Sequence, residues 1–288
     1  MLGQLLVSSL TLGSIYALTA LGFAVIYRAT EVANFSQGEM MMLAAMIALV
    51  LYRDMHLPYV LVALISFSVC LVVAFLIERV AFRPLLGAPH ISVLLSTAAV
   101  AQIIRSGVRA FHGNDLGIFP SAVSMETIVV FGMRFTALNV LIVAVTAATL
   151  GVFAFLFSRT RMGWAMQATA QNLRGAAIVG IHVPNTFSKT WVIAGGLAAI
   201  AGMLLAPLII VTPDMGMIAN KGFVAAILGG FASLSGAVVG GLLLALAENL
   251  IAVYVTSAYK DVLVFLFLIV LLLVRPSGLF GTKRLTRV

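Results

Sequence analysis

Long apolar runs, separated by short polar stretches, make up most of the chain. They cover approximately residues 5–27, 39–52, 58–78, 91–111, 137–157, 190–211, 222–256 and 259–274. A helix needs about 20 apolar residues to cross a bilayer, and most of these runs come close to that length. The pattern therefore predicts an all-α integral membrane protein, a polytopic helical bundle of about 8–9 segments.

Two of the runs depart from this simple pattern. The second run is short for a full crossing, and the seventh is too long for one helix. The long run contains two helix-breaking clusters, Gly229-Gly230 and Ser233-Leu-Ser-Gly236. We therefore divide it into a short or re-entrant piece, 222–232, and a longer helix, 236–256. The short piece would be only about 17 Å long at 1.5 Å per residue, so a complete crossing by it stays open.

The composition agrees with a membrane protein. The 288 residues are 62% hydrophobic and only 9% charged, whereas soluble domains are usually about 25% charged. The formal net charge of +8 does not indicate a nucleic-acid partner, because the basic residues stand singly at the ends of apolar runs. The one cysteine, Cys70, forms no intrachain disulfide. The first run lacks the basic region of a cleavable signal, so we expect it to be retained.

The most basic stretch, 158–189, predicts the orientation. It holds four of the 17 Lys and Arg residues and no acid, and the C-terminal tail 275–288 holds another four. The basic tail residues are Arg275, Lys283, Arg284 and Arg287. Because basic loops remain on the cytoplasmic side, we expect both stretches inside. This places the 112–136 loop and the N-terminus outside.

A weak internal repeat relates the two ends of the chain. Gly13-Ser-Ile-Tyr-Ala precedes Ser36-Gln-Gly-Glu39 much as Gly196-Leu-Ala-Ala precedes Asn220-Lys-Gly-Phe223. The first copy turns on the inside and the second on the outside, which is typical of an inverted-topology repeat with interrupted helices and a midplane site. We expect one transmembrane domain, 1–288, with these parts: repeat halves 5–111 and 190–274, a linking span 137–157, a cytoplasmic loop 158–189 and a tail 275–288.

No arrangement of residues in the sequence indicates an enzyme. The four histidines, His56, His90, His112 and His182, lie in different loops, and no His-Glu pair has helical spacing. A Walker-type phosphate loop is also missing. We therefore expect this chain to bind no metal or cofactor and to hydrolyse no ATP, so that any energy comes from a gradient or from a partner.

Polar residues at the starts of the two interrupted helices are the first pathway candidates. Ser36, Gln37 and Glu39 begin one helix, and Asn220 and Lys221 begin the other. Ser36 and Glu39 have capping-box spacing, in which each side chain bonds the other residue's amide. The functional alternative is that this helix start, with its positive dipole end, lines the pathway. For Asn220 and Lys221 the alternative is a simple surface loop.

Glu248 and Asn249 lie near the middle of a predicted span. A carboxylate is costly there unless it is paired, neutral or in a wet cavity. We include both residues in the candidate pathway, together with Ser233 in the preceding break. A polar cluster that holds helices together, or a proton relay, are the alternatives.

Two further features mark the apolar segments. Arg105 and Arg109 share a helical stripe, so we expect them to face protein or an aqueous cavity, or to snorkel outward. The consecutive methionines at 40, 41 and 42 point around most of a helix. Together with Met46 they could form a soft lining for an apolar substrate or belong to the core, and at least one of the three is expected to face lipid.

The basic stretch 158–189 has the composition of a folded element. Residues 163–174 predict a short helix, and 175–181 predict a second apolar turn that ends before Pro184. A connection between two spans needs only a few residues. The length and the partly apolar surface therefore predict a docking element for another protein.

Motifs along nearly the whole chain resemble permease subunits of the branched-chain amino acid ABC importer family, which pair with a second, homologous permease. The motifs are Asn34-Phe-Ser-Gln-Gly-Glu39, Glu78-Arg79 with Arg83-Pro-Leu85, Gly163-Trp164 through Asn172 to Gly180-Ile181, Gly229-Gly230 with Ser233-Leu-Ser-Gly-Ala237, and Arg275-Pro-Ser-Gly-Leu-Phe280. Each motif is weak alone, and together they are specific.

The resemblance implies a set of partners and a coupling segment. Residues 163–181 would sit in a cleft of a cytoplasmic ATPase, with these candidate contact residues: Gly163, Trp164, Gln167, Asn172, Arg174 and Gly180. Trp164 is expected to anchor the segment by burying a large area. The implied partners are two ABC ATPase subunits that use ATP and Mg, an extracytoplasmic solute-binding protein and a second permease. All would act at a bacterial inner membrane, in contact with lipid.

The expected function is import of branched-chain or other neutral aliphatic amino acids by alternating access. An importer of the same architecture for urea, an amide or an aromatic compound is the first alternative, because the binding protein largely selects the solute. A stand-alone ion-coupled secondary transporter and a structural membrane scaffold are alternatives of other classes. The sequence leaves the solute, the pathway residues and the paired permease open.

Overall fold

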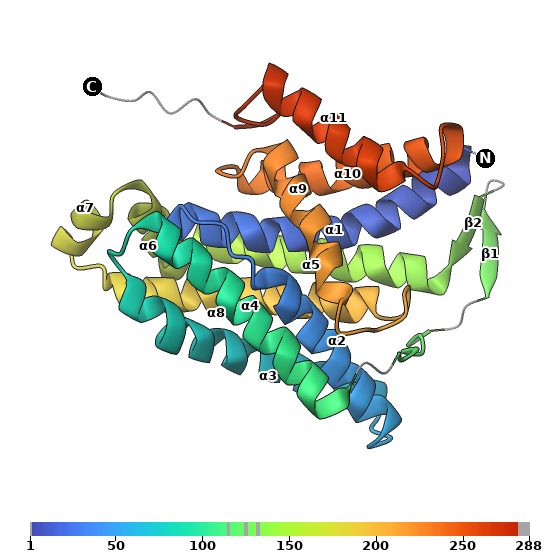
Figure 1. Cartoon of the computed structure of the whole chain (residues 1–288), viewed down its shortest axis with the longest axis horizontal. Helices are drawn as coiled ribbons and strands as arrows, with labels where there is room; N and C mark the ends of the chain where they lie inside the picture. Colours follow the sequence, from blue (N-terminus) through green and yellow to red (C-terminus); the bar gives the residue numbers. More distant parts are fainter. Residues whose placement is uncertain (1, 114–115, 124–125, 131–132, 282–288) are drawn as a thin grey trace.

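The computed structural model describes residues 2–113, 116–123, 126–130 and 133–281 and is almost entirely helical (Figure 1). The α-helices are α1 (Leu2–Thr30), α2 (Gln37–Arg53), α3 (Tyr59–Ile77), α4 (His90–His112), α5 (Ala137–Arg159), α6 (Arg161–Gln171), α7 (Leu173–Ile178), α8 (Val183–Leu205), α9 (Ala219–Gly229), α10 (Leu234–Tyr254) and α11 (Lys260–Val274). Short elements are η1 (Glu78–Phe82), η2 (Arg83–Leu85), η3 (Met215–Ile218), β1 (Thr127–Val130) and β2 (Met133–Thr136). The predicted all-α bundle is confirmed.

Helices α1, α2, α8 and α9 form the centre of the bundle, and α3, α4, α5, α10 and α11 lie around them (Figure 1). α2 is enclosed by α3, α4, α8 and η3. Met40, Met41 and Met42 are each no more than 3% exposed. The expectation that one of them faces lipid is therefore wrong, because every face of α2 meets protein.

Six described helical segments are long and apolar enough to cross a membrane: α1, α3 with η1 and η2, α4, α5, α8 and α10. α2, α9 and α11 are shorter. The start of α1 and the end of α11 lie at opposite ends of the bundle (Figure 1). Together, the six long and three short segments of the described chain agree with the expected bundle of about 8–9 segments.

The starts of α2 and α9 lie deep in the bundle. The side-chain Nε2 of Gln37, the first residue of α2, donates to the carbonyl of Ala194 at 3.0 Å, in the middle of α8. At the start of α9, a Cβ added to Gly222 would lie 2.5 Å from Cγ2 of Thr19 in α1. Both helices therefore begin inside the bundle, as interrupted helices do.

The long apolar run 222–256 is divided as expected. α9 ends at Gly229, and Gly230 adopts a φ of +101°, a conformation that glycine allows and other residues rarely reach. Ser233 then caps α10 by accepting a hydrogen bond from the Gly236 amide at 3.0 Å. Asn220 and Lys221 belong to the first turn of α9, so the surface-loop alternative for them is wrong.

α8 begins at Val183, earlier than the apolar run 190–211 indicates. His182 caps the helix by accepting from the Asn185 amide at 3.3 Å. Pro184 fits the first turn, where its missing amide hydrogen leaves no bond unmade. The last part of the expected loop 158–189 is therefore helical, because a cap and a proline, and not hydropathy, set the start of the helix.

A small antiparallel hairpin occupies part of the 112–136 loop, where the sequence predicted no strand. Thr127 pairs with Thr136, and Ile128 pairs with Phe135. Thr136 also caps α5 by accepting from the Asn139 amide at 3.2 Å. The hairpin lies at the same end of the bundle as the start of α1, and α6, α7 and the end of α11 lie at the other end (Figure 1). Lys283, Arg284 and Arg287 lie outside the described residues.

Candidate functional site

The starts of α2 and α9 meet each other through glycines. A Cβ added to Gly38, in α2, would overlap the carbonyl oxygen of Gly216 and come within 2.9 Å of the Ala219 side chain. A Cβ added to Gly216 would lie 2.9 Å from the carboxylate of Glu39. These positions tolerate only a backbone hydrogen, which lets the two interrupted helices approach closely.

Glu39 is buried at this junction and pairs with Arg105. Its Oε1 accepts from Arg105 Nη2, and its side chain is only 4% exposed. The predicted capping box is wrong, because the Ser36 hydroxyl donates instead to Asn34 Oδ1 at 2.6 Å. Because Ser36 bonds Asn34, Glu39 is not held in a capping box, and its side chain extends to α4.

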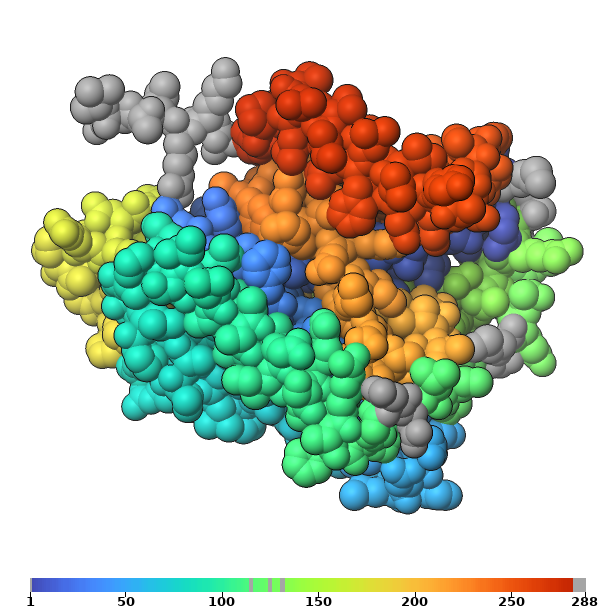
Figure 2. All heavy atoms as spheres, viewed as in Figure 1, coloured from blue at the N-terminus to red at the C-terminus, as the bar shows by residue number. Residues whose placement is uncertain are grey.

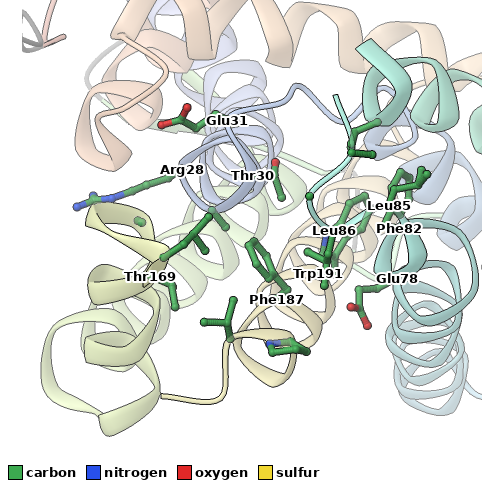
Figure 3. A pocket seen from close by; sticks show the side chains of 18 of the residues that line it. Arg28, Thr30, Glu31, Glu78, Phe82, Leu85, Leu86, Thr169, Phe187 and Trp191 are labelled. Carbon is green, nitrogen blue, oxygen red and sulfur yellow. The ribbon is translucent and has the colours of Figure 1, made fainter. Parts of the chain in front are cut away.

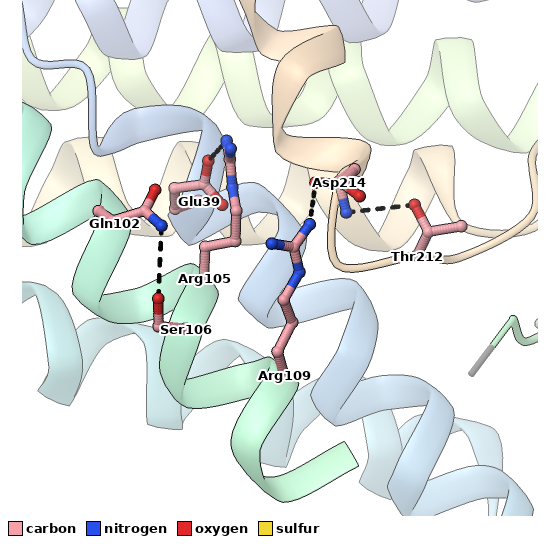
Figure 4. Close-up of polar contacts among 7 residues, drawn as sticks. All are labelled: Glu39, Gln102, Arg105, Ser106, Arg109, Thr212 and Asp214. Atoms are coloured by element: carbon pink, nitrogen blue, oxygen red, sulfur yellow. Dashed lines mark hydrogen bonds and ion pairs between the residues drawn. The ribbon is translucent and has the colours of Figure 1, made fainter. Parts of the chain in front are cut away.

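Arg109 forms a second ion pair one turn further along α4. Its Nη2 lies 2.6 Å from Oδ1 of Asp214, on the loop before η3 (Figure 4). The side chains of Arg109 and Asp214 are 39% and 53% exposed, compared with 24% for Arg105. Both arginines thus face protein, as one of the sequence alternatives had it, and their surroundings become more accessible toward the C-terminal end of α4.

Glu248 lies in a different charged cluster. Its Oε1 accepts from Lys221 Nζ at 2.5 Å and lies 3.2 Å from Lys260 Nζ, and its Oε2 accepts from the Tyr16 hydroxyl at 2.9 Å. Lys221 also pairs with Asp261 at 2.9 Å. The cluster joins α1, α9, α10 and α11, and both Glu248 oxygens have partners. This arrangement favours the alternative in which Glu248 holds helices together.

The remaining pathway candidates are separated from the Glu39 junction. Asn249 donates to the Ser9 hydroxyl at 2.9 Å and thereby joins α10 to α1. Ser233 caps α10 near the opposite end of that helix. Asn220 is exposed at the start of α9. Of the predicted pathway residues, Ser36, Gln37 and Glu39 are buried at the start of α2, where Gln37 bonds α8 and Glu39 bonds α4.

Aromatic rings connect the start of α2 with α9 and with the segment that follows α9. The ring centroids of Phe35 and Phe223 lie 5.7 Å apart, and those of Phe223 and Phe231 lie 5.4 Å apart. Phe35, just before α2, is 41% exposed. Figure 2 shows a hollow between α4 and α11 on one face of the chain, with α9 at its floor. The exposed ring of Phe35 and the half-buried rings of Phe223 and Phe231 give this junction an apolar surface beside its ion pairs.

The predicted coupling segment is folded as α6 and α7. A Cβ added to Gly163 would overlap the carbonyl oxygens of Leu156 and Phe157, so α6 lies directly on the end of α5. Gln167 donates to the Phe157 carbonyl at 2.7 Å. Asn172 caps α7 by accepting from the Gly175 amide at 2.9 Å. Gly180 ends the segment with a φ of +85°.

Trp164 does not anchor the segment by burial, contrary to our expectation. Its side chain is 59% exposed, although Nε1 donates to the Ser158 carbonyl at 3.1 Å. Met166 and Thr169 form the buried side of α6 instead. The exposed apolar residues of α7 are prominent, with Ile178 85% and Val179 75% exposed. The sequence alone did not show which face of α6 packs against the bundle.

A cavity of about 790 Å³ adjoins the coupling segment. The end of α1, the η1–η2 turn, α6 and α7, and the first turns of α8 form its walls (Figure 3). Phe82 and Trp191 stack on one wall with ring centroids 4.2 Å apart, and Glu78 accepts from Ser188 Oγ at 2.5 Å. Arg174 also lines it. A shift of α6 and α7 would therefore change the shape of this opening.

Comparison with known proteins places the chain among transport proteins. Residues 5–272 match the family model described as branched-chain amino acid transport system / permease component. The chain belongs to this permease family. As a family permease it is a multi-pass membrane transport protein, in agreement with its apolar outer helices.

Individual relatives align with this permease from end to end. It is 32% identical over 300 residues to the high-affinity branched-chain amino acid transport system permease protein LivH of Escherichia coli, covering 99% of this chain and 97% of that protein. It is 34% identical over 299 residues to the permease protein BraD of Pseudomonas aeruginosa, with coverages of 99% and 97%. A probable LivH of Methanocaldococcus jannaschii is 28% identical over 301 residues, with coverages of 99% and 95%.

The candidate pathway predicted from the sequence left out four residues that the structure places near the junction of α2 and α9: Phe35, Arg105, Arg109 and Asp214. The two arginines carried a signal, because charges four residues apart in an apolar helix must find partners. Asp214 carried none, since it lies in a loop 105 residues from the arginine that it pairs with.

Proposed function

We propose that this chain is the permease subunit of an ATP-driven, binding-protein-dependent importer of branched-chain amino acids in a bacterial inner membrane. Its alignment over 99% of its length with LivH and BraD, whose names state this substrate class, carries the proposal. The aromatic surface at the α2–α9 junction supports it, because aliphatic side chains pack favourably on exposed rings.

The helix packing supports an alternating-access mechanism based on two inverted halves. α1 packs against α8, α9 and α10, and α8 packs against α1, α2 and α3. The start of α2 meets the middle of α8, and the start of α9 meets α1. The contacts of α1 with α9 and α10 thus correspond to those of α8 with α2 and α3, and the interrupted helices begin where a pathway is expected.

A second, homologous permease would complete the pathway. The hollow between α4 and α11 is open in the single chain (Figure 2). α4, which borders this hollow, carries both ion pairs. We place the second permease over this hollow, so that the solute passes between the two subunits and rocking of the subunits exposes it to alternate sides.

One of the two cytoplasmic ABC ATPases, which bind ATP and Mg, would dock on the α6–α7 segment of this chain. Ile178, Val179 and Trp164 offer an exposed apolar surface, and Gly163 and Gln167 join α6 to α5. Force applied to α7 would therefore reach both the bundle and the adjoining cavity. Basic residues such as Arg159, Arg161 and Arg174 support a cytoplasmic position of this end, and the N-terminus and the solute-binding protein would then lie on the other side.

Reconstitution tests the proposed function. The permease, its paired permease and the ATPases are placed in liposomes, and uptake of labelled leucine, isoleucine and valine is measured with ATP and the binding protein. We expect uptake of these amino acids and little uptake of urea or acetamide. Transport of urea or an amide, with no transport of the three amino acids, would replace the substrate class while keeping the importer architecture.

A stand-alone ion-coupled transporter gains no support from the Glu248 cluster. Both oxygens of that carboxylate are bonded, and Lys221 and Lys260 compensate its charge. Uptake by the purified single chain under an ion gradient, without ATPases, would contradict the proposal.

A further inference from the structure

The Glu39–Arg105 ion pair has unused bonding capacity on both partners. Oε2 of Glu39 and Nε of Arg105 are buried, and neither has a hydrogen-bond partner among the described residues. Buried polar atoms nearly always find partners, so an acceptor and a donor left over at one ion pair call for an explanation. Oε2 of Glu39 requires a hydrogen-bond donor, and Nε of Arg105 requires a hydrogen-bond acceptor.

A zwitterionic amino acid supplies both groups on one carbon atom. Its ammonium group donates to a carboxylate, and its carboxylate accepts from a guanidinium through two parallel bonds, which is the geometry that Arg favours. We propose that Glu39 and Arg105 form a zwitterion-binding site in which Glu39 holds the α-ammonium group and Arg105 holds the α-carboxylate of the transported amino acid. This inference rests on the proposed function, because it assigns the binding site of that substrate.

Charge compensation makes the site selective. Separating Glu39 from Arg105 without replacement partners leaves two charges uncompensated inside the bundle, which is costly in a membrane interior. An inserted zwitterion restores a partner to each group. A neutral solute such as urea or an amide restores neither charge. The two charged groups therefore separate to bind a zwitterion and stay paired in the presence of a neutral solute.

The neighbouring residues give the substrate a route to this site. Arg109 and Asp214, one turn further out, present an exposed positive and an exposed negative group (Figure 4). Gly216 packs against the carboxylate of Glu39 through its backbone alone, since a Cβ there would lie 2.9 Å from the carboxylate atoms. Phe35, four residues before Glu39 in the sequence, supplies a partly exposed ring for the aliphatic side chain. The two ion pairs thus form a series of charged groups that leads from the more exposed Arg109–Asp214 pair to the buried Glu39–Arg105 pair.

Competition binding tests the assignment. The assembled complex of both permeases and the ATPases, without the binding protein, is incubated in detergent with labelled leucine. The competitors are leucine, 4-methylpentanoate, which lacks the ammonium group, and 3-methylbutylamine, which lacks the carboxylate. The wild-type complex should prefer leucine to either analogue by roughly 30-fold or more, because each analogue leaves one buried charge without a partner.

Each variant should lose one specific preference. Glu39→Gln should weaken leucine binding and make leucine and 4-methylpentanoate nearly equal competitors. Arg105→Met should make leucine and 3-methylbutylamine nearly equal. Arg53→Gln is the matched control, because Arg53 is exposed at the far end of α2 beside Asp54. Copurification of the ATPases shows that each variant is folded and assembled.

The outcomes separate the site from the proposed function. Equal preference ratios in the wild type and both variants, or an equal loss of all three compounds, would overturn the site, because a purely structural role changes no preference. Leucine uptake in liposomes combined with no leucine binding by the complex would also overturn it and leave the importer function intact. No leucine uptake by the wild-type complex with ATP and the binding protein would overturn the proposed function and this inference together.

Discussion

The side chain of Gln37 donates to the carbonyl oxygen of Ala194 at 3.0 Å, so the first residue of α2 is bonded to the middle of α8. Gly22 of α1 makes this contact possible, because a Cβ at that position would overlap the Gln37 amide. Three segments that are far apart in the sequence therefore meet at one point, where the interrupted helix α2 begins.

Replacement of Gly22 by alanine should disturb this point. We expect Gly22→Ala to lower the free energy of unfolding by about 1–3 kcal/mol, the usual cost of overfilling a packed core. The double variant Gly22→Ala/Gln37→Ala should lose less than the sum of the two single variants, since the shortened side chain removes the overlap. Unfolding in mixed micelles with increasing sodium dodecyl sulfate measures these differences.

Gly151 provides the control for this prediction. An added Cβ there meets no atom within 4 Å, and Gly151 lies in the helix α5. Gly151→Ala should leave stability unchanged or raise it by about 1 kcal/mol, because alanine favours helix more than glycine does. Equal losses for Gly22→Ala and Gly151→Ala would contradict the described packing of Gln37.

The Glu248 cluster should matter for stability and not for substrate recognition. Glu248→Gln leaves Lys221 and Lys260 without their buried partner, and we expect a loss of about 3–5 kcal/mol in unfolding free energy. Asp261→Asn should cost about 1 kcal/mol or less, because that side chain is 58% exposed. Leucine uptake, divided by the amount of assembled complex, should stay at the wild-type level. A specific loss of leucine uptake in a fully stable Glu248→Gln complex would show that Glu248 belongs to the substrate pathway.

The exposed apolar end of the coupling segment should control ATPase docking. Ile178 is 85% exposed, and Ile178→Ser should weaken the copurification of the ATPases by roughly 30-fold, as expected for a central contact residue. Ile118 is 82% exposed at the opposite end of the bundle, so Ile118→Ser is a control with similar exposure. Copurification from detergent without the binding protein measures both. Undiminished ATPase recovery with Ile178→Ser would place the docking surface elsewhere.

Gly163 should affect coupling more than assembly. An alanine side chain there overlaps the Leu156 and Phe157 carbonyls, so Gly163→Ala should push α6 away from α5 while leaving the exposed surface of α7 intact. We expect normal ATPase copurification and a clear decrease in the ATP hydrolysis that leucine and the binding protein stimulate. Unchanged stimulated hydrolysis would show that close contact between α5 and α6 is not needed for coupling.

Hydrophobicity along the chain was enough to predict the class and most of the spans. Nonpolar residues in a membrane protein must face lipid or the protein interior, so long apolar runs become helices almost regardless of their neighbours. The division of 222–256 was also predictable, because Gly229-Gly230 and Ser233 act locally on the backbone. The early start of α8 was not predicted, since a histidine cap set it and the apolar run did not.

Pairings across the bundle were decided by the tertiary structure alone. Ser36 and Glu39 have the spacing of a capping box. In the structure, Ser36 donates to Asn34 instead, and Glu39 pairs with Arg105 of α4. Trp164 has the size of an anchor, yet it lies on the exposed face of α6. By itself, the sequence determined which segments are helical and apolar, because those properties arise within a few residues. The partners of each buried charge depend on which helices pack together, and only the folded bundle decides that.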